Sequence, residues 1–162
     1  MLSRFNNDIK IIATDFDGVI TDGFVYYSTE SFEELKRVSF KDIMGMSLAV
    51  KNGYKVAIIS GEKNKIIDRI ADKFNLDDVH QGIRDKLAVL LSISEKYSVP
   101  LSSICYFGDD INDISVLEKV GLPITVPDAN CKVKKINNIY ITTAQAGNGA
   151  FREVVGLILD RK

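Results

Sequence analysis

The sequence predicts an α/β fold: a doubly wound, Rossmann-like parallel sheet in a three-layer α/β/α arrangement, with a small β-hairpin flap and no cap domain. Apolar strand-like runs alternate with helix-like stretches almost from end to end, and such alternation implies right-handed crossovers and a parallel sheet covered on both faces. The 162 residues fit a single domain spanning residues 1–162, with no room for a separate cap domain.

The N-terminal half contains the flap. Residues 24–40 mix aromatic and β-branched residues around the turn-like STES, which predicts a β-hairpin. Asn52-Gly53 is a usual helix stop, and the apolar residues after position 63 recur at the 3–4 spacing of an amphipathic helix. The expected elements are, in order, a strand at 9–14, the hairpin at 24–40, a helix at 42–52, a strand at 54–60 and a helix at 63–75.

The C-terminal half continues the alternation. Pro100 lies just beyond one predicted helix and Gly121 closes another. The expected elements are a short strand near 79–80, a helix at 85–97, a strand at 104–108, a helix at 111–120, a strand at 122–126, a short basic helix at 129–136, a strand at 139–142 and a helix at 150–160.

The composition argues against nucleic acid and membrane partners. The formal net charge is −1, apolar residues make up 46% and charged residues 27%, as in soluble globular proteins. No apolar run reaches the ~18 residues of a membrane span, and the polar N-terminus lacks the apolar stretch of a signal peptide. We therefore expect a cytoplasmic protein in which Cys105 and Cys131 are reduced thiols.

The first strand ends in paired acids. The apolar run Ile11 to Ala13 is followed by Asp15, Asp17 and Gly18, although a buried carboxylate costs several kcal/mol or more unless it is paired or binds a metal. Two acids in this position suggest a cation site, or a nucleophile with its acid–base partner. Taken alone, the Asp-x-Asp-Gly pattern could also be a turn or a calcium-loop fragment.

Three further polar groups follow strands or open helices: Ser60-Gly61, Lys86 and the segment from Gly108 through Asp109 and Asp110 to Asp113. Because ligands of open α/β sheets bind outside the carboxyl ends of the strands, we expect Ser60 and Gly108-Asp109 to converge on one crevice with Asp15. Separately, the three groups could be an ordinary turn, a solvated lysine and a helix cap. Their joint occurrence favours one site.

Phosphoryl transfer through a covalent aspartyl phosphate would use every one of these groups. A carboxylate attacks phosphorus, Mg²⁺ lets the two anions approach each other, and a hydroxyl, backbone N–H groups and a lysine neutralise the phosphoryl oxygens. A second carboxylic acid protonates the leaving oxygen and then activates water.

These residues resemble the motifs of a known family. DFDGVITDG, IISGEKN, the lysine of QGIRDK and GDDINDISVLEKVGLP resemble the four motifs of the haloacid dehalogenase superfamily of phosphohydrolases, over a span from about residue 9 to the C-terminus. The segments TDG, FKDIMG, VHQGIRDK and AGNGAFREV are similar to its small capless branch, which contains 3-deoxy-D-manno-octulosonate 8-phosphate phosphatases and nonulosonate (KDN or N-acylneuraminate) 9-phosphate phosphatases.

The resemblance implies a role for each matching residue. It makes Asp15 the nucleophile and Asp17 the general acid/base, with Mg²⁺ as the cofactor. The implied metal ligands are Asp15, the backbone carbonyl of Asp17 and Asp109. The remaining assignments are Ser60 and Lys86 as phosphate-binding groups and Asp113 as a supporting acid near the metal and the lysine.

The family also implies a homotetramer in which the hairpin at 24–40 packs with its neighbours and helps cover an adjacent active site. This agrees with the need to exclude water by some surface other than a cap domain. The glycine-rich segment AGNGAF could be a mobile lid or a plain loop before the last helix.

The implied substrate is a phosphorylated sugar acid. Substrate contacts in the family come partly from the segment after the Ser60 strand, which makes Gly61, Glu62, Arg69 and Lys73 candidates. Octulosonate enzymes usually carry arginine where this chain has Glu62, and both groups tend to show paired arginines where this chain has Arg69 followed by Ile70. We expect octulosonate 8-phosphate, the commoner substrate of this branch, with a nonulosonate 9-phosphate as the alternative.

Functions of other classes fit the pattern less well. A receiver-like signalling domain would need its phosphate-accepting aspartate at the end of the third strand, where this chain has His80-Gln81. A non-catalytic phosphate-binding regulatory module would not need every chemical position filled. A phosphomutase would use the same aspartyl chemistry but would have to shield the intermediate from water.

Overall fold

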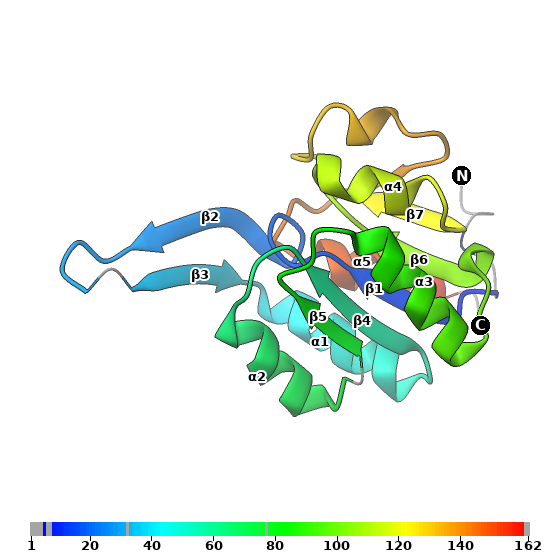
Figure 1. Cartoon of the computed structure of the whole chain (residues 1–162), viewed down its shortest axis with the longest axis horizontal. Coiled ribbons are helices and arrows are strands. Elements are labelled where there is room, and N and C mark those ends of the chain that lie inside the picture. Colours follow the sequence, from blue (N-terminus) through cyan, green and yellow to red (C-terminus); the bar gives the residue numbers. More distant parts are fainter. Residues whose placement is uncertain (1–4, 6–7, 32, 77, 161–162) are drawn as a thin grey trace.

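A six-stranded parallel sheet forms the centre of this computed structural model, which describes residue 5 and residues 8–31, 33–76 and 78–160 (Figure 1). Neighbouring strands follow the order β5-β4-β1-β6-β7-β8, and every pair is parallel. The strands are β1 (Ile11–Thr14), β4 (Lys55–Ser60), β5 (Asp78–Gln81), β6 (Ile104–Phe107), β7 (Leu122–Thr125) and β8 (Tyr140–Ile141).

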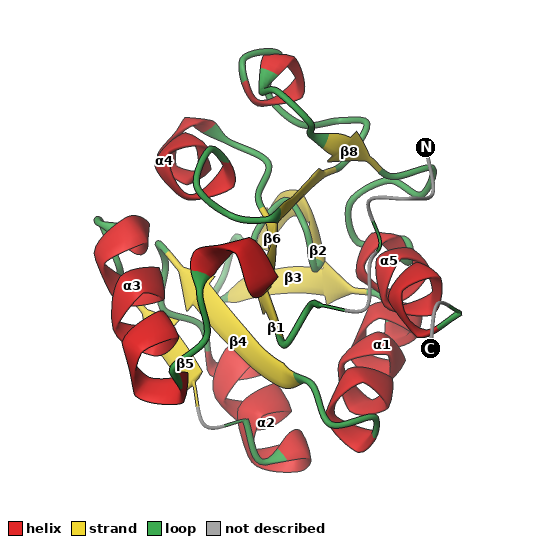
Figure 2. Ribbon diagram, turned by 90° about the vertical axis from the view of Figure 1, so that its right-hand side faces the viewer, coloured by secondary structure: helices red, strands yellow, loops and turns green. Residues whose placement is uncertain are grey.

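Helices cover both faces of the sheet (Figure 2). One face packs against α1 (Phe40–Lys51), α2 (Lys65–Phe74) and α5 (Ala150–Leu159), and the other against α3 (Lys86–Tyr97) and α4 (Ile114–Leu117). The described residues also form three short 3₁₀ turns: η2 (Leu101–Ser103), η3 (Ile111–Asp113) and η4 (Val133–Lys135). This confirms the predicted doubly wound α/β/α fold.

The central strand β1 shows why the sheet needs both helical layers. All four of its residues are buried, and successive side chains point to opposite faces. Ile12 belongs to the core cluster on the side of α1, α2 and α5, whereas Ile11 and Ala13 belong to the cluster on the side of α3 and α4. A strand that is apolar on both faces fits the middle of a parallel sheet.

Most predicted elements are present with bounds within two residues of the prediction, but two predicted helices are much shorter. The helix expected at 111–120 is η3 followed by the four-residue α4, because Asp110 and Asp113 form a capping box that starts the segment with a 3₁₀ turn. The basic helix expected at 129–136 is only η4, in which Val133 alone is buried, so the segment has too small an apolar face to hold a longer helix.

The predicted hairpin consists of β2 (Thr21–Tyr27) and β3 (Glu34–Val38), and it projects away from the sheet (Figure 1). Its first strand begins three residues earlier than predicted. Large apolar side chains lie exposed along it, with Phe24, Tyr27 and Leu35 each about two-thirds accessible. In the described part of the chain, we find no helix with the length and apolar character of a membrane span.

A buried carboxylate on α1 holds the start of α5. Asp42 is fully buried and accepts hydrogen bonds from the backbone N–H groups of Gly149, at 2.9 Å, and Arg152, at 3.1 Å. Gly149 occupies the N-cap of α5 and has no side chain to satisfy these N–H groups, so Asp42 caps the helix from a distance of 107 residues in sequence.

We expect Asp42→Ala to lower the free energy of unfolding by about 2–3 kcal/mol, because a buried and a partly buried N–H group lose their acceptor. Denaturant unfolding measures this value. The matched control is Asp72→Ala on the exposed side of α2, which should change it by less than about 0.5 kcal/mol. Equal effects of the two substitutions would contradict the capping role.

Candidate active site

The sheet topology brings the predicted site residues together. β1 lies between β4 and β6, and the three strands are parallel, so their carboxyl ends meet at one edge. Asp15 directly follows β1, Ser60 ends β4 and Asp109 comes two residues after β6. The backbone N–H of Asp15 donates to the carbonyl of Phe107 at 2.9 Å, which ties the two strand ends to each other.

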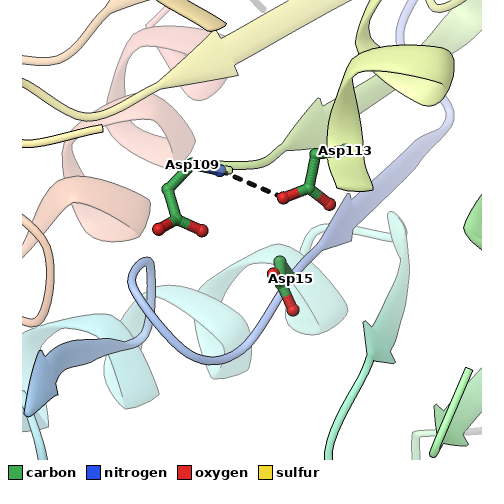
Figure 3. Close-up of side chains that lie close together, drawn as sticks. All are labelled: Asp15, Asp109 and Asp113. Atoms are coloured by element: carbon green, nitrogen blue, oxygen red, sulfur yellow. Dashed lines mark hydrogen bonds between the residues drawn. The ribbon is translucent and has the colours of Figure 1, made fainter. Parts of the chain in front are cut away.

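Three carboxylates gather at this edge. Oxygen atoms of Asp15, Asp109 and Asp113 all lie within 4.8 Å of one another, and Figure 3 shows the three side chains close together at this edge of the sheet. One oxygen of Asp113 accepts the backbone N–H groups of Asp109, at 3.2 Å, and Asp110, at 3.3 Å. Asp113 therefore shapes the loop that carries Asp109.

Lys86 contacts two of these carboxylates as a fully buried cation. Its Nζ is 2.7 Å from Oδ2 of Asp15 and 2.8 Å from Oδ1 of Asp113. The hydroxyl of Tyr106 donates to the same Asp113 oxygen at 2.8 Å. Lys86 is the first residue of α3, where Asp85 caps the helix by accepting the N–H of Ala88. The helix start thus fixes the position of the ammonium group.

Burial and mutual repulsion raise the pKa values of two acids in this cluster. Burial and the charge of Asp113 raise the pKa of Asp15 to about 7, although Lys86 opposes the rise. Burial and the charges of Asp15 and Asp113 raise the pKa of Asp109 to about 8. Burial lowers the pKa of Lys86, but the two adjacent carboxylates outweigh it and raise the value above normal.

This donor set suits a divalent cation. When all three acids are ionised, one ammonium leaves an excess of two negative charges among oxygen ligands, the type that Mg²⁺ prefers. A bound cation would favour the ionised acids in the same way that Lys86 does. The residues present therefore fit a metal site.

Gly18 allows the loop after β1 to approach Asp109. Its φ of +76° lies in the left-handed region, and a Cβ atom there would lie 2.1 Å from Oδ2 of Asp109. A side chain at this position would displace the Asp109 carboxylate. The glycine of the DFDG motif is thus required both by the turn and by the packing of the acidic cluster.

Asp17 lies nearer to solvent than Asp15. Its side chain is 30% exposed, and its two oxygens have different partners. Oδ2 lies 2.8 Å from Nζ of Lys36 on β3, and Oδ1 accepts the Thr21 hydroxyl at 3.3 Å. The two acids of the motif therefore face different environments.

The site opens into a cleft of about 280 Å³. Ser60 lies at its edge, buried, with its Oγ accepting the N–H of Glu62 at 3.2 Å. The predicted residues Asp15, Asp17, Ser60 and Asp109 line the cleft, together with their neighbours. The full lining is Asp15, Asp17, Gly18, Gly23, Ser60, Gly61, Glu62, Asp109, Asp110 and Asn112. The predicted convergence on one crevice is thus present in the structure.

Two of the predicted substrate contacts lie apart from this cleft. Arg69 and Lys73 are exposed on α2, and neither is among the lining residues. Nζ of Lys73 lies 5.6 Å from the centre of the Phe40 ring and 5.5 Å from that of Phe74. Ile70 is buried in the core, so its side chain does not face the site.

The segment after β8 is bound closely to the loop that follows β1. The N–H of Gly147 donates to the carbonyl of Val19 at 2.9 Å, and a Cβ at this residue, with φ +60°, would lie 2.6 Å from the nitrogen of Asp22. Nη2 of Arg37 donates to Asn148 at 3.0 Å. Of the two interpretations of AGNGAF, this packing favours a fixed loop over a mobile lid.

Sequence reasoning missed four side chains around the site: Tyr106, Lys36, Thr21 and Asn112. Tyr106 stands out only as a phenol within an otherwise apolar strand, which indicates a hydrogen-bond partner inside. Lys36 lies 19 residues from Asp17 in the sequence, and no local pattern links them. Thr21 opens the TDG segment, in which the acid is the more conspicuous residue.

Comparison with known proteins supports the resemblance to haloacid dehalogenase phosphohydrolases. The sequence model of the haloacid dehalogenase-like hydrolase family matches residues 64–153. The 3-deoxy-D-manno-octulosonate 8-phosphate phosphatase KdsC of Escherichia coli is 34% identical over 152 residues, which cover 94% of this chain and 80% of that protein. The corresponding protein of Yersinia pestis is 32% identical over the same share of each chain.

The fold also matches solved structures of phosphatases. The 3-deoxy-D-manno-octulosonate 8-phosphate phosphatase of Moraxella catarrhalis, in complex with a magnesium ion, a phosphate ion and KDO, has a TM-score of 0.92 and 33% identity. The alignment covers 99% of this chain and 91% of that one. Together with the acidic cleft at the carboxyl ends of β1, β4 and β6, these matches show that the chain belongs to the haloacid dehalogenase-like hydrolase family.

Proposed function

We propose that this protein is a Mg²⁺-dependent phosphatase that hydrolyses 3-deoxy-D-manno-octulosonate 8-phosphate through a phosphorylated Asp15. The observation that carries the proposal is the buried contact of Asp15 with Lys86, at 2.7 Å, beside the carboxylates of Asp109 and Asp113. A nucleophilic carboxylate, a cation for phosphoryl oxygens and a ligand set for a metal are the parts that this reaction requires.

The metal ligands in this proposal are the carboxylates of Asp15 and Asp109 and the backbone carbonyl of Asp17. Asp113, whose oxygens are already bound by Lys86, Tyr106 and two backbone N–H groups, would hold the lysine and the Asp109 loop in place. When bound, Mg²⁺ supplies the positive charge that lets an anionic carboxylate approach an anionic phosphate.

The reaction has two displacements at phosphorus. An oxygen of Asp15 attacks, the bond from phosphorus to the sugar oxygen breaks, and Asp17 gives its proton to that oxygen. Asp17 then takes a proton from water, whose oxygen attacks phosphorus and releases phosphate and the free Asp15 carboxylate. Ser60, Gly61 and Lys86 would stabilise the phosphoryl oxygens during both steps.

The substrate follows from the relatives. The curated proteins named above and the Moraxella structure carry the octulosonate 8-phosphate activity in their names, and we therefore favour this substrate over a nonulosonate 9-phosphate. Glu62 lies at the cleft, where it could accept hydrogen bonds from sugar hydroxyls. Arg69 and Lys73 stay proposed contacts for the sugar carboxylate. Because neither lines the cleft of its own subunit, they could reach the substrate only in an arrangement that a single subunit does not provide.

We also propose that the protein acts as a cytoplasmic homotetramer. Phe24, Tyr26, Tyr27 and Leu35 are exposed along the projecting hairpin, and all four are apolar or amphipathic side chains that a protein–protein contact would bury. The cleft is lined by Gly23 at the base of the hairpin and opens to solvent, so a neighbouring subunit could exclude water from it.

The direct test of the proposed function is a phosphatase assay in the presence of Mg²⁺. We expect kcat/KM for 3-deoxy-D-manno-octulosonate 8-phosphate to exceed that for nonulosonate 9-phosphates, and Asp15→Asn to abolish turnover because an amide cannot form the acyl phosphate. Circular dichroism and thermal unfolding would verify that the variant keeps its fold. Turnover by a folded Asp15→Asn variant would refute the aspartyl-phosphate mechanism. A higher kcat/KM for a nonulosonate 9-phosphate would refute the proposed substrate.

The metal proposal predicts a pH-dependent stabilisation. Because the pKa values of Asp15 and Asp109 are raised to about 7 and about 8, the folded protein keeps protons that the unfolded chain loses from about pH 4 upward. Without divalent cations, stability should therefore fall between about pH 4 and 8. Mg²⁺ requires ionised ligands, so the Tm increase that it causes should be larger at pH 8 than at pH 6.

At 100-fold excess over its Kd, Mg²⁺ should raise Tm at pH 8 by about 5–10 °C. Differential scanning calorimetry with and without Mg²⁺ measures this, and Asp109→Asn is the matched variant in which most of the increase should disappear. A Tm increase independent of pH, or one retained by Asp109→Asn, would argue against this ligand set.

The proposed tetramer predicts the molecular mass of the wild type in solution, and a lower mass when the hairpin contact is disrupted. Light scattering of the wild type should give four times the 18.0 kDa of one chain. Tyr27→Glu on the hairpin should lower the mass, because it places a charge in the apolar contact. Leu91→Glu, on the exposed side of α3, is the matched control and should leave the mass unchanged. An active wild-type monomer would contradict the tetramer.

A further inference from the structure

We propose that Lys36 is a positioning residue, which fixes the carboxylate of Asp17 and links its orientation to the geometry of the β2–β3 hairpin. This inference rests on the proposed function, in which Asp17 moves protons. Lys36 lies outside the four family motifs.

Lys36 faces inward from β3, a strand of which only Lys36 and Val38 are not exposed. Its neighbours Leu35 and Arg37 have 64% and 51% exposure, whereas the side chain of Lys36 is only 6% exposed. Its Nζ lies 2.8 Å from Oδ2 of Asp17 and 3.3 Å from Oε1 of Glu34. Such burial of an ammonium group is costly without an ion pair, so the contact with Asp17 is a specific feature of this fold.

The carboxylate of Asp17 is held from both strands of the hairpin. Oδ1 accepts the hydroxyl of Thr21, the first residue of β2, and Oδ2 accepts from Lys36 in the middle of β3. Lys36 pairs with Val25, and the register between the strands shifts in the stretch from Thr21 to Val25. The two anchors of Asp17 therefore keep their spacing only while this irregular pairing is maintained.

This arrangement has a consequence for the first displacement. The proton of Asp17 must reach the leaving oxygen while the bond to phosphorus breaks, and a carboxyl group that rotates freely is seldom aligned for this. The need for a proton depends on the leaving group: a sugar alkoxide needs one, whereas the phenolate of p-nitrophenyl phosphate leaves without it. Loss of Lys36 should therefore affect the two substrates unequally.

The kinetic test compares these two phosphates by kcat/KM, which reports the steps up to departure of the leaving group. We expect Lys36→Met to lower kcat/KM for the sugar-acid phosphate by about 10- to 100-fold and that for p-nitrophenyl phosphate by less than about 3-fold. Lys36→Arg, which keeps the charge, should restore most of the loss. Asp17→Asn should show the same substrate dependence with a larger loss.

The matched control is Arg37→Met, which removes the next cation on β3. Arg37 contacts Asp22 and Asn148 instead of Asp17, so its loss should not change the ratio between the two substrates. An equal loss for both substrates in Lys36→Met, or no loss at all, would overturn the positioning role. Failure of Lys36→Arg to recover activity would also count against it.

Crystal structures of the wild type and Lys36→Met, grown with Mg²⁺, test the same inference without an activity assay. We expect the Asp17 carboxylate to leave its position in the variant while Asp15 and Asp109 keep theirs. An unchanged Asp17 would overturn the proposal. If the wild type hydrolyses neither phosphate, the proposed function fails, and this structural comparison still decides the role of Lys36.

Discussion

The contact of Lys86 with Asp15 and Asp113 is the interaction on which the arrangement of the site depends. An ammonium group without solvent exposure is stable only because two carboxylates lie within 2.8 Å of it. It joins the end of β1, the loop after β6 and the start of α3. Removal of Lys86 would leave two buried carboxylates without their cation, so the fold and the chemistry depend on the same ion pairs.

Asp113 extends the constraint to the rest of the acidic cluster. Its second oxygen binds the N–H groups of Asp109 and Asp110, and the Tyr106 hydroxyl from β6 reaches its first. Gly18 then lets the Asp17 loop close over Asp109. The acidic cluster is thus held by groups with no part in the displacements, and its excess of negative charge prepares it for a divalent cation.

Much of the fold and of the site could be predicted from the sequence, because both depend on local patterns. Buried parallel strands are continuous apolar runs, and ligands bind at their carboxyl ends, so the order of the elements is enough to place Asp15, Ser60 and Asp109 at one edge. The lengths of the helices predicted at 111–120 and 129–136 were wrong, since side-chain caps and a small apolar face decided them.

The amino-acid sequence alone is sufficient for the family, the order of most elements and the candidate residues for phosphoryl transfer, because each is encoded by residue types at short spacing. The contacts between distant side chains required the folded chain. Lys36 reaches Asp17 across 19 residues, and Asp42 caps a helix 107 residues away. The fold also places Arg69 and Lys73 outside the cleft. Such contacts depend on how a hairpin and two helices pack in space, which no local pattern specifies.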